Sequence, residues 1–259
     1  MVDFLLSILK VFFPSLFSED EKSDEIKKES SNCTGDKKIM KEEFEINNSK
    51  KDDYYKQTNN KIDPFISCFP TSMINAGETI GLKFPTDKEH TNGYEQPEDG
   101  YNWYLENNPE CVAFYSKPAY KDYLSNKENH PRELYDVEEF AFNKWIGKNV
   151  CKLIYGITVE KIIEVIKNGG AVVTSGKFCG FGHVIAIIGL KYVVETEGDI
   201  SESTVNNFIV DDSYGNYKDG YKKVGIGGND VEIEKNEFLS IINKGTPDKP
   251  IYNGIVFEK

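Results

Sequence analysis

The spacing of the hydrophobic positions changes part-way along the chain. In the first half they recur at helical intervals, most clearly in the run that starts at Cys68 and continues to Ile80. Residues 83–99 are rich in turn formers and are expected to be a loop. The further helices predicted from the same spacing cover residues 101–107, 119–125, 131–145 and 158–168.

In the second half the apolar residues become consecutive and largely β-branched, which is typical of buried strands. The strands predicted are Ala171–Thr174, Gly182–Leu190, Phe208–Asp212, Tyr221–Ile226 and Ile251–Phe257. One helix, Lys235–Asn243, is expected among them. Helices followed by a set of antiparallel strands predict an α+β fold for residues 54–259.

Two segments precede this domain. Residues 1–17 have a broad apolar helical face that Pro14 interrupts, and they are too short to span a bilayer. Three uses stay open for them: an interfacial anchor with weak membrane contact, a helix docked on the domain, or an atypical export signal. Residues 18–53 are highly charged, contain Cys33, and predict a mobile linker.

Composition excludes several classes of function. The chain has 259 residues and a formal net charge of -12, which argues against a nucleic acid partner because phosphate contacts need an excess of Lys and Arg. Five Cys without C-x-x-C spacing indicate a reducing compartment rather than a disulfide framework. With three His in the chain, we expect no metal and no cofactor.

Cys68 is the first candidate for chemistry. It lies where the polar segment that carries Gln57 meets a predicted helix. The free backbone N–H groups and the positive dipole end of a helix start favour a thiolate, which is the nucleophilic form of cysteine. A small buried hydrophobic residue is the simpler interpretation of Cys68 on this stretch alone.

Two polar positions on the predicted strands complete a candidate site. His183 begins one strand, and Asp211 and Asp212 end the next. If these strands are antiparallel neighbours, a carboxylate lies beside the imidazole, where it would orient the ring as a base for a thiol. Gln57 and the backbone N–H of Cys68 would then stabilise an oxyanion.

The joint pattern resembles a known family. It is similar to papain-like cysteine peptidases of family thirty-nine, the bacteriocin-leader peptidases, in a stand-alone form. Four segments carry the resemblance: residues 57–60 (QTNN), 68–73 (CFPTSM), 182–189 (GHVIAIIG) and 209–216 (IVDDSYGN). The resemblance covers residues 54–259. It implies a papain-like fold in which the nucleophile helix packs on an antiparallel sheet.

The resemblance also implies roles for four residues. Cys68 would be the nucleophile, His183 the general base and acid, Asp212 the orienting carboxylate and Gln57 an oxyanion-hole donor. This chain has Asp212-Ser213 where the family usually has Asp-Pro, so Asp211 stays an alternative for the third role. Cys179, in a Gly-rich loop before His183, is a competing nucleophile without a helix start.

These features predict a hydrolase that acts on peptide bonds through a Cys68 acyl-enzyme. The stand-alone form of the family indicates peptidoglycan peptides as substrate, as in a bacteriophage endolysin or cell-wall hydrolase, and a monomer. The location stays open between the cytoplasm before lysis and the cell wall. The alternatives are a protein-processing thiol protease, a catalytically silent module that binds peptide or cell wall, and acyl transfer to an amine.

Overall fold

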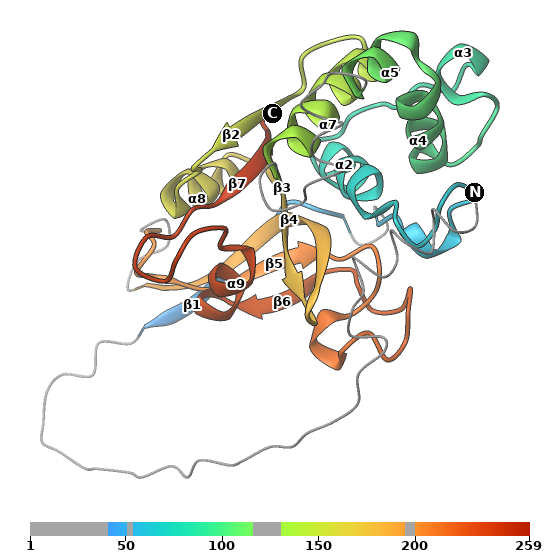
Figure 1. Ribbon diagram of the computed structural model, residues 1–259. Coiled ribbons are helices and arrows are strands. Elements are labelled where there is room, and N and C mark those ends of the chain that lie inside the picture. The colour runs from blue at the N-terminus through green and yellow to red at the C-terminus, as the bar shows by residue number, and fades with distance from the viewer. Residues whose placement is uncertain (1–40, 51–53, 116–130, 195–199) are drawn as a thin grey trace, which may run out of the picture.

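The structure is a computed structural model that describes residues 41–50, 54–115, 131–194 and 200–259. The amphipathic segment 1–17, Cys33 and the helix expected over 119–125 lie outside these residues. Figure 1 shows one mixed sheet-and-helix body. Within the described residues, no helix has the length and apolar character needed to cross a membrane.

An antiparallel sheet forms the centre of this body. Its strands run in the order β2-β7-β3-β4-β5-β6, and β1 pairs with β4 off this path. Every recorded strand pair is antiparallel. The strands are β1 (Glu42–Asn47), β2 (Cys151–Tyr155), β3 (Ala171–Phe178), β4 (Phe181–Val194), β5 (Val205–Asp211), β6 (Val231–Glu234) and β7 (Asn253–Phe257).

Helices cover both faces of the sheet, and Figure 1 shows the two groups apart. On one side lie α2 (Cys68–Thr79), α4 (Pro97–Asn107), α5 (Pro109–Tyr115) and α7 (Pro131–Ile146), with the single-turn α3 (Lys88–Thr91) beside α4. On the other lie α8 (Val159–Lys167) and α9 (Lys235–Ile242). The expected combination of helices with an antiparallel sheet is confirmed.

Alternation along the strands divides the apolar core in two. Val173, Ala186 and Ile188 pack with the helices of the α2 side, whereas Val172 and Ile187 pack with α8 and α9. Successive side chains of a strand point to opposite faces, so a sheet buried on both faces needs continuous apolar runs. This explains why the strand sequences are not alternately polar.

Helix ends follow the capping rules where the sequence suggests them. The Thr158 side chain accepts a hydrogen bond from the Lys161 backbone N–H at the start of α8, as expected. At the other end Gly169 has a φ of 80°, the left-handed conformation that glycine adopts readily. The predicted α8 helix is therefore confirmed at both ends.

The first strand corrects an expectation. The linker was expected to reach residue 53, but Glu42–Asn47 forms β1 and pairs with Gly189–Val194 of β4. Phe44 stacks on Tyr192, with ring centroids 5.5 Å apart. Charged residues alternate with these apolar ones, because only one face of β1 is partly covered. The linker prediction is wrong for this segment.

Other boundaries also differ from the sequence prediction. The expected loop 83–99 contains α3 and the first turn of α4. The expected strand Tyr221–Ile226 is a series of turns, and the strand next to β5 is β6 instead. Positive φ angles at Tyr221 and Gly225 are incompatible with an extended strand there. Strand β2 and helix α5 were not anticipated.

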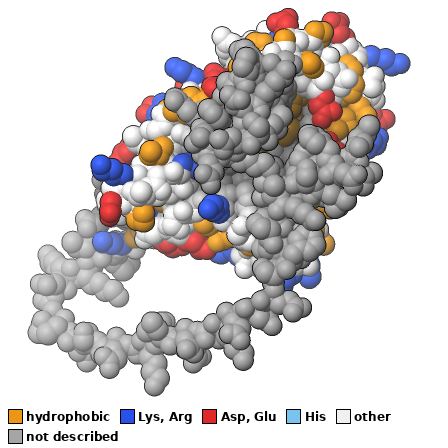
Figure 2. Space-filling model, viewed as in Figure 1, with side chains coloured by type: hydrophobic (Ala, Val, Ile, Leu, Met, Phe, Trp, Pro, Cys, Tyr) orange, Lys and Arg blue, Asp and Glu red, His pale blue; other side chains and the backbone are white. Residues whose placement is uncertain are grey.

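Charge is mixed over the exposed surface. On the face shown in Figure 2, acidic, basic and apolar side chains are interspersed. Several pairs bridge different elements, such as Lys191 of β4 with Glu232 of β6 at 2.7 Å and with Glu45 of β1 at 3.5 Å. Exposed pairs of this kind contribute little to stability, on the order of 0–1 kcal/mol each.

The contact of β1 with β4 gives a first prediction. A side chain at Gly189 would meet the backbone oxygen of Ile46. We therefore expect Gly189→Ala to lower the free energy of unfolding by about 1–3 kcal/mol, measured by urea denaturation. Lys191→Ala on the same strand is the control and should cost less than about 1 kcal/mol. Equal effects of the two changes would contradict the close approach of β1.

Candidate active site

Cys68 is the first residue of α2, and its side chain is partly exposed. One turn later, the Ser72 hydroxyl donates a hydrogen bond of 2.9 Å to the backbone oxygen of Val184 in β4. Residues four apart lie on the same face of a helix. The Ser72–Val184 contact therefore turns the Cys68 face of α2 toward the start of β4, where His183 precedes Val184.

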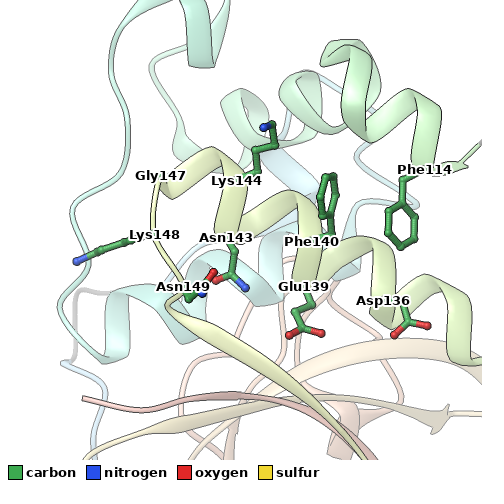
Figure 3. A pocket seen from close by; sticks show the side chains of 9 residues that line it. All are labelled: Phe114, Asp136, Glu139, Phe140, Asn143, Lys144, Gly147, Lys148 and Asn149. Atoms are coloured by element: carbon green, nitrogen blue, oxygen red, sulfur yellow. The ribbon is translucent and has the colours of Figure 1, made fainter.

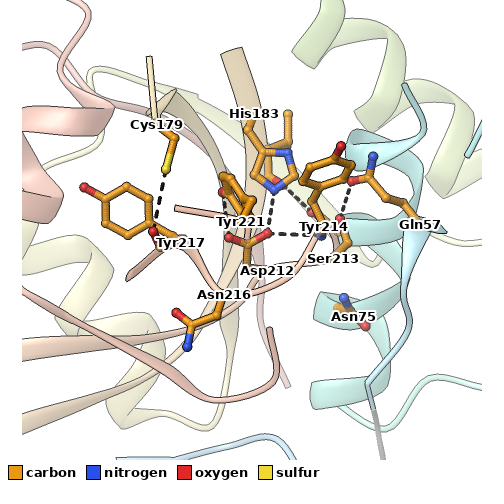
Figure 4. A network of polar contacts seen from close by, with 12 residues as sticks. Gln57, Asn75, Cys179, His183, Asp212, Ser213, Tyr214, Asn216, Tyr217 and Tyr221 are labelled. Carbon is orange, nitrogen blue, oxygen red and sulfur yellow. Dashed lines mark hydrogen bonds and ion pairs between the residues drawn. The ribbon is translucent and has the colours of Figure 1, made fainter. Parts of the chain in front are cut away.

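His183 and Asp212 meet at one end of the sheet. Strands β4 and β5 are antiparallel, and Ala186 lies opposite Asp211, so the start of β4 adjoins the end of β5. The distance from His183 Nε2 to Asp212 Oδ1 is 2.7 Å, and both side chains are almost fully buried. The expected neighbourhood of the two strands is confirmed, and Figure 4 shows the pair.

Asp212 is fixed by further hydrogen bonds. The Tyr221 hydroxyl donates to Oδ2 at 2.8 Å, and the Tyr214 backbone N–H donates to Oδ1 at 3.1 Å. The Tyr54 hydroxyl donates to the Asp212 backbone oxygen at 2.5 Å. Asp211 points elsewhere, because its Oδ1 accepts from the Asp230 backbone N–H at 3.2 Å. Of the two carboxylates, Asp212 is the one that contacts the imidazole.

Aromatic rings enclose the imidazole of His183. Phe178, Phe181, Tyr214 and Tyr221 contact it with their ring edges or faces at centroid distances of 5.9–6.4 Å. Only 3% of the His183 side chain is exposed. Such an apolar wall limits the access of water, which strengthens the electrostatic interaction between the ring and Asp212.

These surroundings set the pKa of His183. Burial by itself lowers it, but the charge and hydrogen bond of Asp212, together with a side-chain hydrogen bond to Cys68, outweigh burial and raise it from 6.5 to about 10. Since Asp212 occupies Nε2, Nδ1 is the ring nitrogen left for Cys68. The arrangement favours a protonated imidazole between a carboxylate and a sulfur at neutral pH.

Gln57 lies on the 3-10 turn η2 (Gln57–Asn59) and is buried. The Ser213 hydroxyl donates to its Oε1 at 2.8 Å, and its Nε2 donates to the Pro64 oxygen at 3.2 Å. Its backbone N–H also donates to the Ser213 oxygen at 3.1 Å. These contacts fix the amide with its nitrogen away from Ser213 and leave one N–H for another acceptor.

Polar anchors hold the segment between Gln57 and Cys68. Asn60 donates from Nδ2 to the hydroxyls of Ser67 and Thr71, at 2.9 and 3.1 Å. Asp99 of α4 accepts the backbone N–H groups of Lys61 and Ile62, at 2.7 and 3.0 Å. The segment is therefore tied to α2 and α4 rather than left as a free loop.

The other described cysteines are less suited to nucleophilic attack. Cys179 is exposed, but burial of its sulfur and the charges of Asp212 and Asp219 raise its pKa. Burial raises the pKa of Cys111 to about 11 and that of Cys151 well above its usual range. Figure 4 shows Cys179 next to Tyr217, whose backbone oxygen is 3.6 Å from the sulfur.

A hollow away from these residues lies on α7. It has a volume of about 660 Å³ and is lined by residues of α5, α7 and the turn that follows α7, as Figure 3 shows. Phe114, Phe140 and Asn143 are among them, but none of the four predicted site residues is. Among the described residues, no group of three or more His, Cys, Asp or Glu could hold a metal ion.

Comparison of the chain with family models, curated proteins and solved structures finds no match. The structure brings Cys68, His183 and Asp212 together, with Gln57 bonded to the residue after Asp212. Their catalytic roles stay predictions.

Sequence reasoning missed the residues that support this group. The sequence pattern predicts a strand at Tyr221, whereas Tyr221 bonds to Asp212 from a turn. In the sequence Ser213 is only a departure from the Asp-Pro pattern of the family, whereas in the structure its hydroxyl donates to Gln57 and so links Gln57 to the residue after Asp212. The surplus of tyrosines, 15 in the chain, was a signal that buried hydroxyl donors were available.

The raised pKa of His183 predicts a pH-dependent stability. The folded protein holds this proton more tightly than the unfolded chain, so the contribution is complete below about pH 6.5 and declines as pH rises toward about 10. Asp212→Asn removes the carboxylate that contributes most to raising the pKa of His183. Its loss in unfolding free energy, measured in urea, should be larger at pH 6 than at pH 10 by at least about 1 kcal/mol.

Asp211→Asn is the control for this comparison. Asp211 binds the Asp230 backbone and not the imidazole, so its effect should change little over the same pH range. A loss for Asp212→Asn that is identical at pH 6 and pH 10 would contradict the proposed interaction.

Proposed function

We propose that this protein is a cysteine peptidase of papain-like fold that hydrolyses peptide bonds through Cys68. The observation that carries the proposal is the buried contact of His183 with Asp212, beside a cysteine at a helix start. A nucleophile, a base and a group that orients the base are the three parts that covalent acyl transfer needs. The partial exposure of Cys68 leaves the sulfur within reach of a substrate.

In the first half of the reaction, the Cys68 thiolate attacks the carbonyl carbon of the scissile bond. The developing oxyanion would be stabilised by the Cys68 backbone N–H, which has no acceptor within the helix at its first position, and by the remaining N–H of Gln57. His183 then donates its proton to the leaving amine. The carbon–nitrogen bond breaks, and the acyl group stays on the sulfur.

In the second half, a water molecule replaces the amine. His183, now neutral, accepts a proton from the water as the oxygen attacks the thioester carbon. The carbon–sulfur bond breaks, and the thiolate and the imidazolium are restored. Asp212 keeps the ring in one orientation through both halves and stabilises its charged form. If an amine took the place of water, the same residues would transfer the acyl group.

The proposal of a substrate class rests on the family resemblance. It favours peptidoglycan peptides, as for an endolysin or cell-wall hydrolase, over a protein-processing role. A catalytically silent binding module is the alternative from another class. The buried pair of His183 and Asp212 argues against a catalytically silent protein. Burying charged groups costs free energy, and a surface that only binds peptide does not require such a pair.

Alkylation tests the nucleophile directly. We expect iodoacetamide at pH 7 to modify Cys68 at least about ten times faster than Cys179, because a thiolate held by an imidazolium reacts faster than a thiol. His183→Ala should remove most of this difference. The measurement is mass spectrometry of the modified peptides over time, and Cys33 serves as an internal reference.

Hydrolysis tests the reaction itself. Release of amino groups from casein and from purified peptidoglycan should be measured for the wild type and for Cys68→Ala. Activity on either substrate that the variant lacks supports the peptidase. The proposal fails if neither substrate is cleaved and Cys68 and Cys179 are alkylated equally slowly.

Ser213 offers a test of the oxyanion donor. Ser213→Ala leaves the Gln57 oxygen without its donor, and we expect kcat to fall about ten-fold with little change in KM. Gln57→Ala should cost about 100-fold. In the double variant the Ser213 change should add nothing, because Ser213 acts through Gln57. Additive losses would show that Ser213 acts by another route.

A further inference from the structure

Exposed apolar side chains gather beside the candidate active site. Among the described residues, six large hydrophobic side chains are exposed. Four of them lie on two segments, 54–67 and 213–228, that lead to Cys68 and away from Asp212. They are Phe65 (61% exposed), Ile66 (39%), Val224 (45%) and Ile226 (61%). Exposed apolar residues that cluster in this way mark interaction sites more often than scattered ones do.

The two segments are in contact with each other through Gln57 and Thr58. Gln57 bonds to Ser213 on one side and to the Pro64 oxygen, next to Phe65, on the other. Gly225, which separates Val224 from Ile226, lies so close to Thr58 that an added Cβ would meet its hydroxyl. The exposed apolar pairs therefore flank the predicted oxyanion donor from both segments.

The apolar residues on the second segment are held firmly. The Gly225 backbone N–H donates to the Tyr214 oxygen at 2.7 Å, and the Ile226 N–H donates to the Lys223 oxygen at 3.1 Å. Gly225 has a φ of 73°, which an L-residue adopts only with strain. This fixed turn holds the side chains of Val224 and Ile226 exposed to solvent. Their fixed exposure indicates that they contact a bound molecule.

Charge identifies the chemistry of that molecule. Acidic residues outnumber basic ones by 43 to 31 in the whole chain, but segments 54–67 and 213–228 carry five lysines and two aspartates. Lys56, Lys61, Lys222 and Lys223 are exposed, and no ion pair among the described residues involves them. A locally positive surface in an acidic protein is suited to carboxylates on a ligand.

We propose that segments 54–67 and 213–228 bind a polypeptide that carries large apolar side chains and carboxylates next to the scissile bond. This inference rests on the proposed peptidase function and names its substrate class. Peptidoglycan stem peptides supply carboxylates but no large apolar side chain. The surface therefore favours a protein or peptide substrate over the cell-wall substrate that the family resemblance suggests.

Binding to an inactive variant tests the surface without relying on catalysis. The protein is the full chain with Cys68→Ala, and the probe is a fluorescent twelve-residue peptide that contains Leu, Phe, Asp and Glu. Two matched peptides replace either Leu and Phe by Ser, or Asp and Glu by Lys. We expect fluorescence anisotropy to show at least about ten-fold weaker binding of each matched peptide.

Surface variants identify where the peptide binds. Phe65→Ser and Ile226→Ser, each added to Cys68→Ala, should weaken binding of the first peptide about ten-fold. Ile251→Ser is the control, since Ile251 is 49% exposed but lies outside the two segments. Circular dichroism of each variant checks that the fold is retained.

The outcomes separate the two proposals. Selective binding that depends on Phe65 and Ile226 supports the inference, even if the wild type does not cleave the peptide, in which case the peptidase proposal alone is in error. Equal binding of the three peptides, or equal loss with Ile251→Ser, overturns the inference and leaves the peptidase intact. Stronger binding of soluble peptidoglycan fragments than of the first peptide also overturns it.

Discussion

The buried contact between His183 and Asp212 is the interaction on which the rest of the site depends. Neither group is stable alone in that position, because an isolated charge away from water is costly. Their contact requires β4 and β5 to be antiparallel neighbours in one register, and it requires Tyr221 and the Tyr214 N–H to satisfy the remaining carboxylate positions. The fold of the second half of the chain thus determines whether Cys68 has a partner.

Much of this arrangement could be predicted from the sequence, for physical reasons that differ by element. The α8 helix carries its own cap at Thr158, and β4 is a long β-branched run, so local preference and burial agree. The meeting of His183 with Asp212 followed from antiparallel pairing, which fixes which strand ends adjoin. The choice between Asp211 and Asp212 could not be made, because a change of one residue in register exchanges the two faces.

The errors have physical causes as well. The segment Tyr221–Ile226 has strand-like composition, but its shape is set by positive φ angles and by a bond from Gly225 to Tyr214, which no local pattern reveals. Strand β1 is charged at alternate positions, so its composition resembles that of a linker. It forms a strand because β4 extends beyond the end of β3 and offers β1 an edge on which to pair. Both results depend on contacts between distant parts of the chain.

The pairing of β1 also determines where mechanical load would enter the domain. Glu42 lies opposite Val194, and Asn47 lies opposite Gly189, so the chain that precedes β1 leaves the sheet at the end of β4 farthest from His183. Tension applied through the preceding residues would separate the Glu42–Val194 end first. A partner tethered there, or a fusion made upstream of Glu42, would pull on the domain while the His183 end of β4 stays shielded.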